Sequence, residues 1–178
     1  MKRGLTILSL IILFAGAKGQ QIAQFTQYNF NLFGINPAIA GTKECVDMRI
    51  GYRTQWVGFE GAPKTAFANF HTRIFKKSRY SQGKHGIGAM VESDQMGPTA
   101  NTTLMLAYAY HVSLNHKVWL SAGLFAGIQQ YRFNASYVTL DNYNDDAIGG
   151  SSSAFLYPDI SPGLWLYSDD FYLGLSLR

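Results

Sequence analysis

Histidines and a cysteine are the side chains of this 178-residue chain best suited to bind a metal or to transfer protons. The four histidines, His71, His85, His111 and His116, are spread over separate segments, and Cys45 is the single cysteine. A metal site needs ligands that converge, and the sequence has neither an H-x-x-x-H pair nor a Cys/His pairing. A lone cysteine also cannot form an internal disulfide. We therefore expect no metal and no cofactor, and we interpret His71 and His111 as solvated histidines on the polar side of their strands.

Nucleophilic catalysis and calcium binding find equally little support in the residue spacing. A serine hydrolase of the common type carries Gly-x-Ser-x-Gly between a strand and a helix, whereas the serines at 151–153 follow two glycines in a long polar loop. The acidic run at 141–146 lacks the residues that an EF-hand calcium loop needs at its third and sixth positions. A loose external cation site is the lesser alternative to a solvated acidic loop. The prediction is a protein without catalytic residues, and hence not an enzyme.

Five basic residues cluster around one connection between predicted strands: Arg73, Lys76, Lys77, Arg79 and Lys84. Two interpretations have equal weight. The cluster could dock an acidic partner surface on the periplasmic side, or it could be a charged cap that keeps a turn out of lipid. Nucleic-acid binding is not indicated, because removal of an N-terminal signal with three of the 15 basic residues leaves 12 against 11 acidic ones.

The segments that would position these side chains alternate with a period of two, as half-buried β-strands do. Seven segments show this alternation, at 46–56, 64–75, 85–93, 102–114, 118–131, 159–168 and 170–177. Strands that are aliphatic on one side, with aromatic residues near their ends, predict an all-β fold, an antiparallel transmembrane β-barrel of the outer membrane. A soluble sandwich or lipocalin-like barrel has the same period, but the outward faces are too aliphatic for water. Trp56 and Phe59, beside the first turn, would belong to the aromatic girdle at headgroup depth.

The residues before the first predicted strand divide into two parts. Residues 1–19 combine a basic start, a short apolar run and small residues, which predicts a signal peptide cleaved near Gly19 and Gln20 and export to the outer membrane. Residues 20–44 are too apolar to float in solvent, and we expect an internal plug or a periplasmic lid that ends at the turn of Asn36 and Pro37. The barrel would occupy 45–178. Because bacterial single-chain barrels have even strand numbers, seven strands predict that the chain is an incomplete part of a larger barrel.

Connection lengths predict the orientation of the barrel. With a periplasmic N-terminus, the connections at 57–63, 94–101 and 132–158 are external. The two tightest turns, at 115–117 and 169, are then periplasmic, as bacterial barrels prefer.

Several motifs are similar to those of one known family. They are 24–28 (QFTQY), 36–41 (NPAIAG), 55–65 (QWVGFEGAPKT), 97–102 (GPTANT), 108–110 (YAY) and 167–176 (YSDDFYLGLS). In this order they span nearly all of the mature chain and resemble the PorP/SprF family of Bacteroidetes. The resemblance implies an outer-membrane barrel associated with type IX secretion and gliding motility. Within these motifs, the candidate partner-contact residues are Asn36, Pro37, Gly41, Gln55, Trp56, Gly58, Phe59, Gly61, Pro63 and Lys64.

Two functions remain open from the residues alone, because both need strands that are polar inside and apolar outside. One is a secretion component that binds other parts of the system and a cargo protein. The other is a channel for small solutes, and either could use the inner space beside Gly86, Gly88, Gly123 and Gly127. The resemblance favours the first, a non-catalytic protein that helps to export secreted proteins such as adhesins or to attach them to the surface. The expected partners are secretion-system components, cargo and outer-membrane lipid, with no nucleic acid and no small-molecule substrate.

Overall fold

The computed structural model describes residues 28–74, 83–115, 117–134 and 153–177. Several predicted features lie outside these ranges. They are the signal peptide, the acidic run at 141–146, Ser151 and Ser152, His116, and the basic residues Lys76, Lys77 and Arg79.

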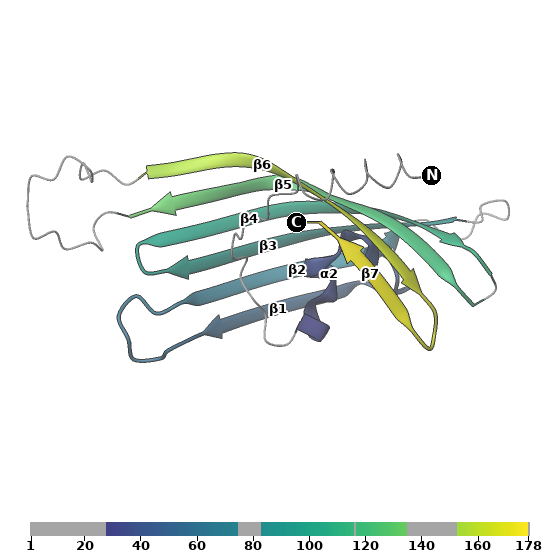
Figure 1. Cartoon of the computed structure of the whole chain (residues 1–178), viewed down its shortest axis with the longest axis horizontal. Coiled ribbons are helices and arrows are strands. Elements are labelled where there is room, and N and C mark those ends of the chain that lie inside the picture. The colour runs from purple at the N-terminus through teal and green to yellow at the C-terminus, as the bar shows by residue number, and fades with distance from the viewer. Residues whose placement is uncertain (1–27, 75–82, 116, 135–152, 178) are drawn as a thin grey trace, which may run out of the picture.

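Seven antiparallel strands form one sheet in the order of the sequence, which confirms the predicted fold class. Figure 1 shows the sheet curled like half of a barrel, with β7 folded back beside β6. The strands are β1 (Asp47–Thr54), β2 (Lys64–Ile74), β3 (Gly83–Met96), β4 (Thr99–Ser113), β5 (Trp119–Phe133), β6 (Ser153–Tyr167) and β7 (Tyr172–Ser176).

Side chains alternate between the two faces of the sheet as the sequence predicts. On β4, Leu104, Leu106 and Tyr108 are exposed on the convex side, whereas Met105 and Ala107 between them are at most 5% exposed. An apolar convex face and a more polar concave face are what a membrane β-barrel requires, because lipid surrounds it.

β3 and β4 extend beyond their predicted ends and meet in a two-residue turn, Gly97 and Pro98, in place of a connection at 94–101. Gly97 adopts the left-handed φ of +54° that such a turn favours. Pairing continues past the apolar stretch because backbone hydrogen bonds do not depend on apolar side chains. This tight turn lies at the end of the sheet predicted to be external. The premise that the tightest turns all lie at the opposite end is therefore wrong, and connection length gives no orientation.

β6 begins at Ser153, six residues before the predicted start at 159. Pro158 and Pro162 make this part of the sequence unlike a strand, because proline lacks the N–H that a sheet ladder uses. β7 pairs with β6 only from Gly163 onward, so Pro158 lies where β6 is an edge strand in the described part of the chain. An edge tolerates the missing donor.

The chain before β1 lies on the concave face of the sheet (Figure 1). It forms the 3-10 helix η1 (Tyr28–Asn31), one α-helical turn α2 (Leu32–Ile35) and the 3-10 helix η2 (Pro37–Ile39). We call residues 28–44 the inner segment. Its buried side chains join inward residues of the sheet in the hydrophobic core, which consists of Phe33, Ala38, Ile39, Ala40, Met90, Met105, Ala107, Ala109, Phe125 and Trp165.

Among the residues described, no helix combines the length and the apolar character needed to cross a membrane.

Candidate functional site

Glycines on the inner face of three strands form the surface on which the inner segment rests. A Cβ atom on Gly86 of β3 would overlap the Ala40 carbonyl, and one on Gly123 of β5 would overlap the backbone of Ala38. On β6, a Cβ on Gly163 would overlap the side chain of Asn36. The backbone of the inner segment therefore lies directly on the backbone of the strands. The space expected beside the inner glycines is filled by the chain itself.

Asn36 ties the inner segment to the last two strands. Its Nδ2 donates hydrogen bonds to the carbonyls of Leu164 on β6 (2.9 Å) and Leu175 on β7 (3.3 Å). Its Oδ1 accepts a hydrogen bond from the N–H of Ala38 (2.9 Å) and so caps η2, whose first residue is the buried Pro37. Both polar atoms of the Asn36 side chain are thus hydrogen-bonded inside the fold.

Two polar side chains of the sheet bind the main chain that follows Asn36. The Ser121 hydroxyl on β5 donates to the Ala38 carbonyl (2.6 Å), and His111 Nε2 on β4 donates to the Ala40 carbonyl (2.7 Å). Since Nε2 carries the proton, His111 Nδ1 is an acceptor, and the Tyr167 hydroxyl on β6 donates to it (3.1 Å). Three strands thus act together on the main chain at Ala38 and Ala40.

β2 holds the end of the inner segment. The N–H of Gly41, whose φ is +80°, donates to His71 Nδ1 (3.4 Å). The Arg73 guanidinium donates to the carbonyls of Gly41 (3.3 Å) and Thr42 (3.1 Å) and pairs with Glu44 (2.7 Å). Gly41 is required here because its Cα side faces Gly86 with no room for a side chain.

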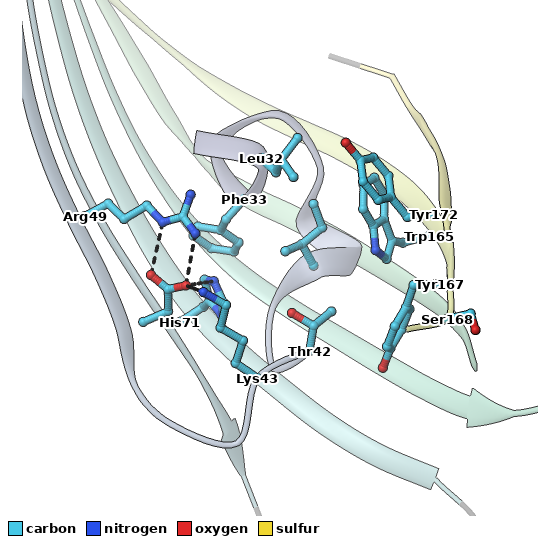
Figure 2. Close-up of a pocket in the computed structure, with 12 residues that line it drawn as sticks. Leu32, Phe33, Thr42, Lys43, Arg49, His71, Trp165, Tyr167, Ser168 and Tyr172 are labelled. Carbon is cyan, nitrogen blue, oxygen red and sulfur yellow. Dashed lines mark hydrogen bonds and ion pairs between the residues drawn. The ribbon is translucent and has the colours of Figure 1, made fainter. Parts of the chain in front are cut away.

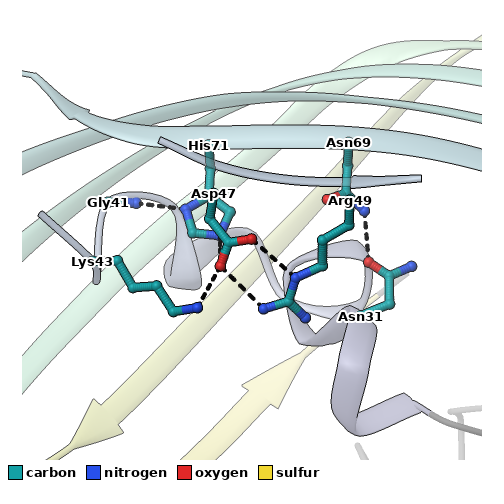
Figure 3. Close-up of polar contacts among 7 residues, drawn as sticks. All are labelled: Asn31, Gly41, Lys43, Asp47, Arg49, Asn69 and His71. Atoms are coloured by element: carbon teal, nitrogen blue, oxygen red, sulfur yellow. Dashed lines mark hydrogen bonds and ion pairs between the residues drawn. The ribbon is translucent and has the colours of Figure 1, made fainter. Parts of the chain in front are cut away.

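The two histidines are buried, with His71 2% and His111 0% exposed, so the expectation of solvated histidines is wrong. They do face inward as predicted, but the inner segment covers them. Next to His71, Asp47 accepts hydrogen bonds from Arg49 (3.1 Å) and Lys43 (2.6 Å), and His71 Nε2 lies 3.8 Å from the carboxylate (Figure 3). These groups satisfy one another and hold the start of β1 against β2.

A cavity of about 180 Å³ opens between the inner segment and the two flanks of the sheet (Figure 2). One wall carries the charged side chains Lys43 and Arg49. The other carries Trp165 and Tyr172, which stack with their ring centroids 4.9 Å apart. No nucleophile paired with a base lines it. Within the residues described, no three histidine, cysteine or acidic side chains gather where they could hold a metal ion.

The two described members of the basic cluster are engaged inside the fold. Arg73 clamps the inner segment, and Lys84 Nζ lies 3.5 Å from the ring centre of Trp119, a cation–π contact across β4. The structure thus gives these two residues internal partners.

The candidate contact residues from the resembling motifs fall into two groups. Asn36, Pro37 and Gly41 are buried in the inner segment. The residues from Gln55 to Pro63 form the turn between β1 and β2, the β1–β2 turn, and Lys64 is the first residue of β2.

The β1–β2 turn presents large apolar side chains on a hydrogen-bonded backbone. Trp56 and Phe59 are 70% and 76% exposed. Backbone hydrogen bonds run from Gln55 N to the Pro63 carbonyl (3.0 Å) and from Phe59 N to the Trp56 carbonyl (3.1 Å). Trp56 has φ +50°, a left-handed conformation that is rare for a bulky residue. The Gly61 carbonyl accepts a hydrogen bond from the N–H of Gly97 in the β3–β4 turn (2.9 Å).

Ser121 and Tyr167 are the functional residues of the concave face that sequence reasoning missed. Both occupy inward positions of their strands, which is the signal that could have found them. Ser121 binds the main chain of the inner segment, and Tyr167 binds His111, and neither partner leaves a mark in the strand pattern.

The family model described as type IX secretion system membrane protein PorP/SprF matches residues 17–178. No curated protein and no solved structure shows a significant match.

Proposed function

Because the chain belongs to the PorP/SprF family of type IX secretion system membrane proteins, we propose that it is a non-catalytic component of that machinery in the outer membrane. Its role is to help export secreted proteins such as adhesins, or to attach them to the cell surface. Its partners are other components of the system, the cargo protein and the lipid around the convex face.

The occupied concave face is the observation that carries this proposal. A solute channel needs a wet lumen lined by free polar groups. On the described strands, the inward polar side chains of Ser121, His111 and Arg73 instead bind the inner segment. We infer that residues 20–44 are an internal plug, and that the protein works through its surfaces rather than through a pore in this half of the sheet. The channel alternative has no observation in its favour on the strands that the structure describes.

The β1–β2 turn is the proposed contact for another component of the machinery. Exposed aromatic residues are typical of binding hot spots, and the hydrogen bonds within this turn lower the conformational entropy that is lost when they are covered. Gln55, Gly58, Gly61, Pro63 and Lys64 would set the shape of this contact. Asn36, Pro37 and Gly41 would support it only through the fold. We propose Lys76, Lys77 and Arg79 as a second contact, which would bind an acidic surface of a partner.

Deletion of the gene tests the proposed function. We expect a surface protein to be lost from the cell surface or to accumulate inside the outer membrane, while uptake of small hydrophilic solutes is unchanged. Complementation with the wild-type gene should restore secretion. Normal secretion together with slower solute uptake would overturn the proposal and favour a channel.

A further inference from the structure

The inner segment is held in the way that a bound peptide is held. None of its residues pairs in the sheet, and a stretch of main chain from Ala38 to Thr42 is bound by side chains of the sheet. Hydrogen bonds to carbonyls and N–H groups recognise a backbone conformation and not particular side chains. The sheet thus recognises mainly the main chain of the inner segment.

The shape of the concave face limits which peptide fits. Ala38 and Ala40 are 0% exposed, and their main chain lies against inner glycines, so a larger side chain at either position would displace packed neighbours. Ile39 is buried between them and supplies one aliphatic anchor, and Gly41 takes a left-handed φ. The matching ligand is a short peptide with the order proline, small, aliphatic, small, glycine.

Three buried polar atoms of the sheet, on Asn69, Asn101 and Ser161, and one of the inner segment, Asn31 Nδ2, have no hydrogen-bond partner among the described residues. Asn69 is 3% exposed and Ser161 is 1% exposed, and Asn69 Oδ1 and Ser161 Oγ have no hydrogen-bond partner in the described structure. Asn69 points at the inner segment, because its Nδ2 donates to Asn31 Oδ1 (2.6 Å; Figure 3). Ser161 pairs in register with Phe125, which packs on Phe33 with 5.3 Å between ring centroids. Unpaired buried polar atoms cost stability, so the occupant does not use all the binding groups of this face.

We propose that the concave face is a peptide-binding groove that now holds the chain's own residues 36–42 and accepts in their place a peptide of the same chemistry from a second polypeptide. This inference goes beyond the secretion role and does not depend on it. A tethered occupant has an effective concentration on the order of millimolar, so a free peptide competes only when the occupant is weakened.

The first test weakens the occupant in the full chain. Asn36→Ala removes the bonds to β6 and β7, and Gly41→Ala places a Cβ against Gly86 at an unfavourable φ. A fluorescent peptide with the sequence of residues 34–43 is added to the detergent-solubilised double variant, and anisotropy is recorded. We expect binding at least tenfold tighter than to the wild type. A double variant with wild-type β-sheet circular dichroism that does not bind the peptide would overturn the proposal.

The control is a peptide whose residues corresponding to Ala38 and Ala40 are both leucine. Because these positions have no space for larger side chains, its binding should be at least tenfold weaker. Equal binding of the two peptides would show that association occurs elsewhere, which also contradicts the groove.

A second test needs no destabilising substitution. A protease site is inserted after Glu44, where the chain is exposed, and the wild-type protein is cut after it has folded. The N-terminal piece should stay with the sheet during size-exclusion chromatography and be released by an excess of the peptide, but not by the leucine control. The proposal would be overturned if the N-terminal piece separated from the sheet at once and the sheet then failed to bind the added peptide.

Discussion

Single residues decide how closely the inner segment approaches the sheet. Gly123 touches the backbone of Ala38, whereas the neighbouring Ala122 faces the convex side. We expect Gly123→Val to destabilise the folded protein by about 1–3 kcal/mol, the usual range for an overpacked core. Ala122→Val should change stability little. Thermal unfolding in detergent, followed by circular dichroism, compares the two variants. Equal stability of both would mean that the contact at Gly123 is not made.

His111 is the second place where one side chain determines the contact. His111→Gln keeps an N–H donor for the Ala40 carbonyl, whereas His111→Leu leaves that carbonyl and the Tyr167 hydroxyl without a partner. Burial of an unpaired polar group costs about 1–3 kcal/mol. The leucine variant should therefore unfold at clearly lower urea concentration than the glutamine variant. The reverse order would contradict the assigned hydrogen bonds.

At the scale of elements, alternation along the chain predicts the strands and their faces, because each inward and outward position has a consistent residue type. It underestimates β3, β4 and β6, where pairing continues through polar residues or prolines. The basic cluster and the motif residues Asn36 and Gly41 could be found in the sequence, but their roles could not. Those roles depend on a segment that crosses the inner face, and no local pattern encodes such a crossing.

The β1–β2 turn can be separated from the strands by mutation. Trp56→Ser with Phe59→Ser should reduce co-purification of other secretion components about tenfold or more, as loss of hot-spot residues does, and leave thermal stability unchanged. Tyr52→Ser, on the convex side of β1, is the matched control and should retain the partners. If the turn variant instead lowers the amount of protein in the membrane, the aromatic pair acts as a lipid anchor.

At the scale of the whole molecule, the two ends of the sheet must lie on opposite sides of the membrane. Cys45 is exposed just before β1, and Val57 is exposed in the β1–β2 turn at the opposite end. With a periplasmic N-terminus, a membrane-impermeant maleimide should label Cys45 only after the outer membrane is opened. In a Cys45→Ser background, Val57→Cys should react on intact cells. Reversed labelling would invert the orientation and place the β1–β2 turn in the periplasm.

The two hydrogen bonds of Asn36 also constrain the order in which the molecule can assemble. They join residues separated by 128 and 139 positions, so they cannot form until β6 and β7 have been synthesised and paired. Contacts of such long range are slow to form, because the intervening chain must first lose its freedom. The inner segment leaves the ribosome before every strand, yet its attachment is among the last events of folding. The burial of its apolar side chains therefore reports that the last strands have paired in the correct register.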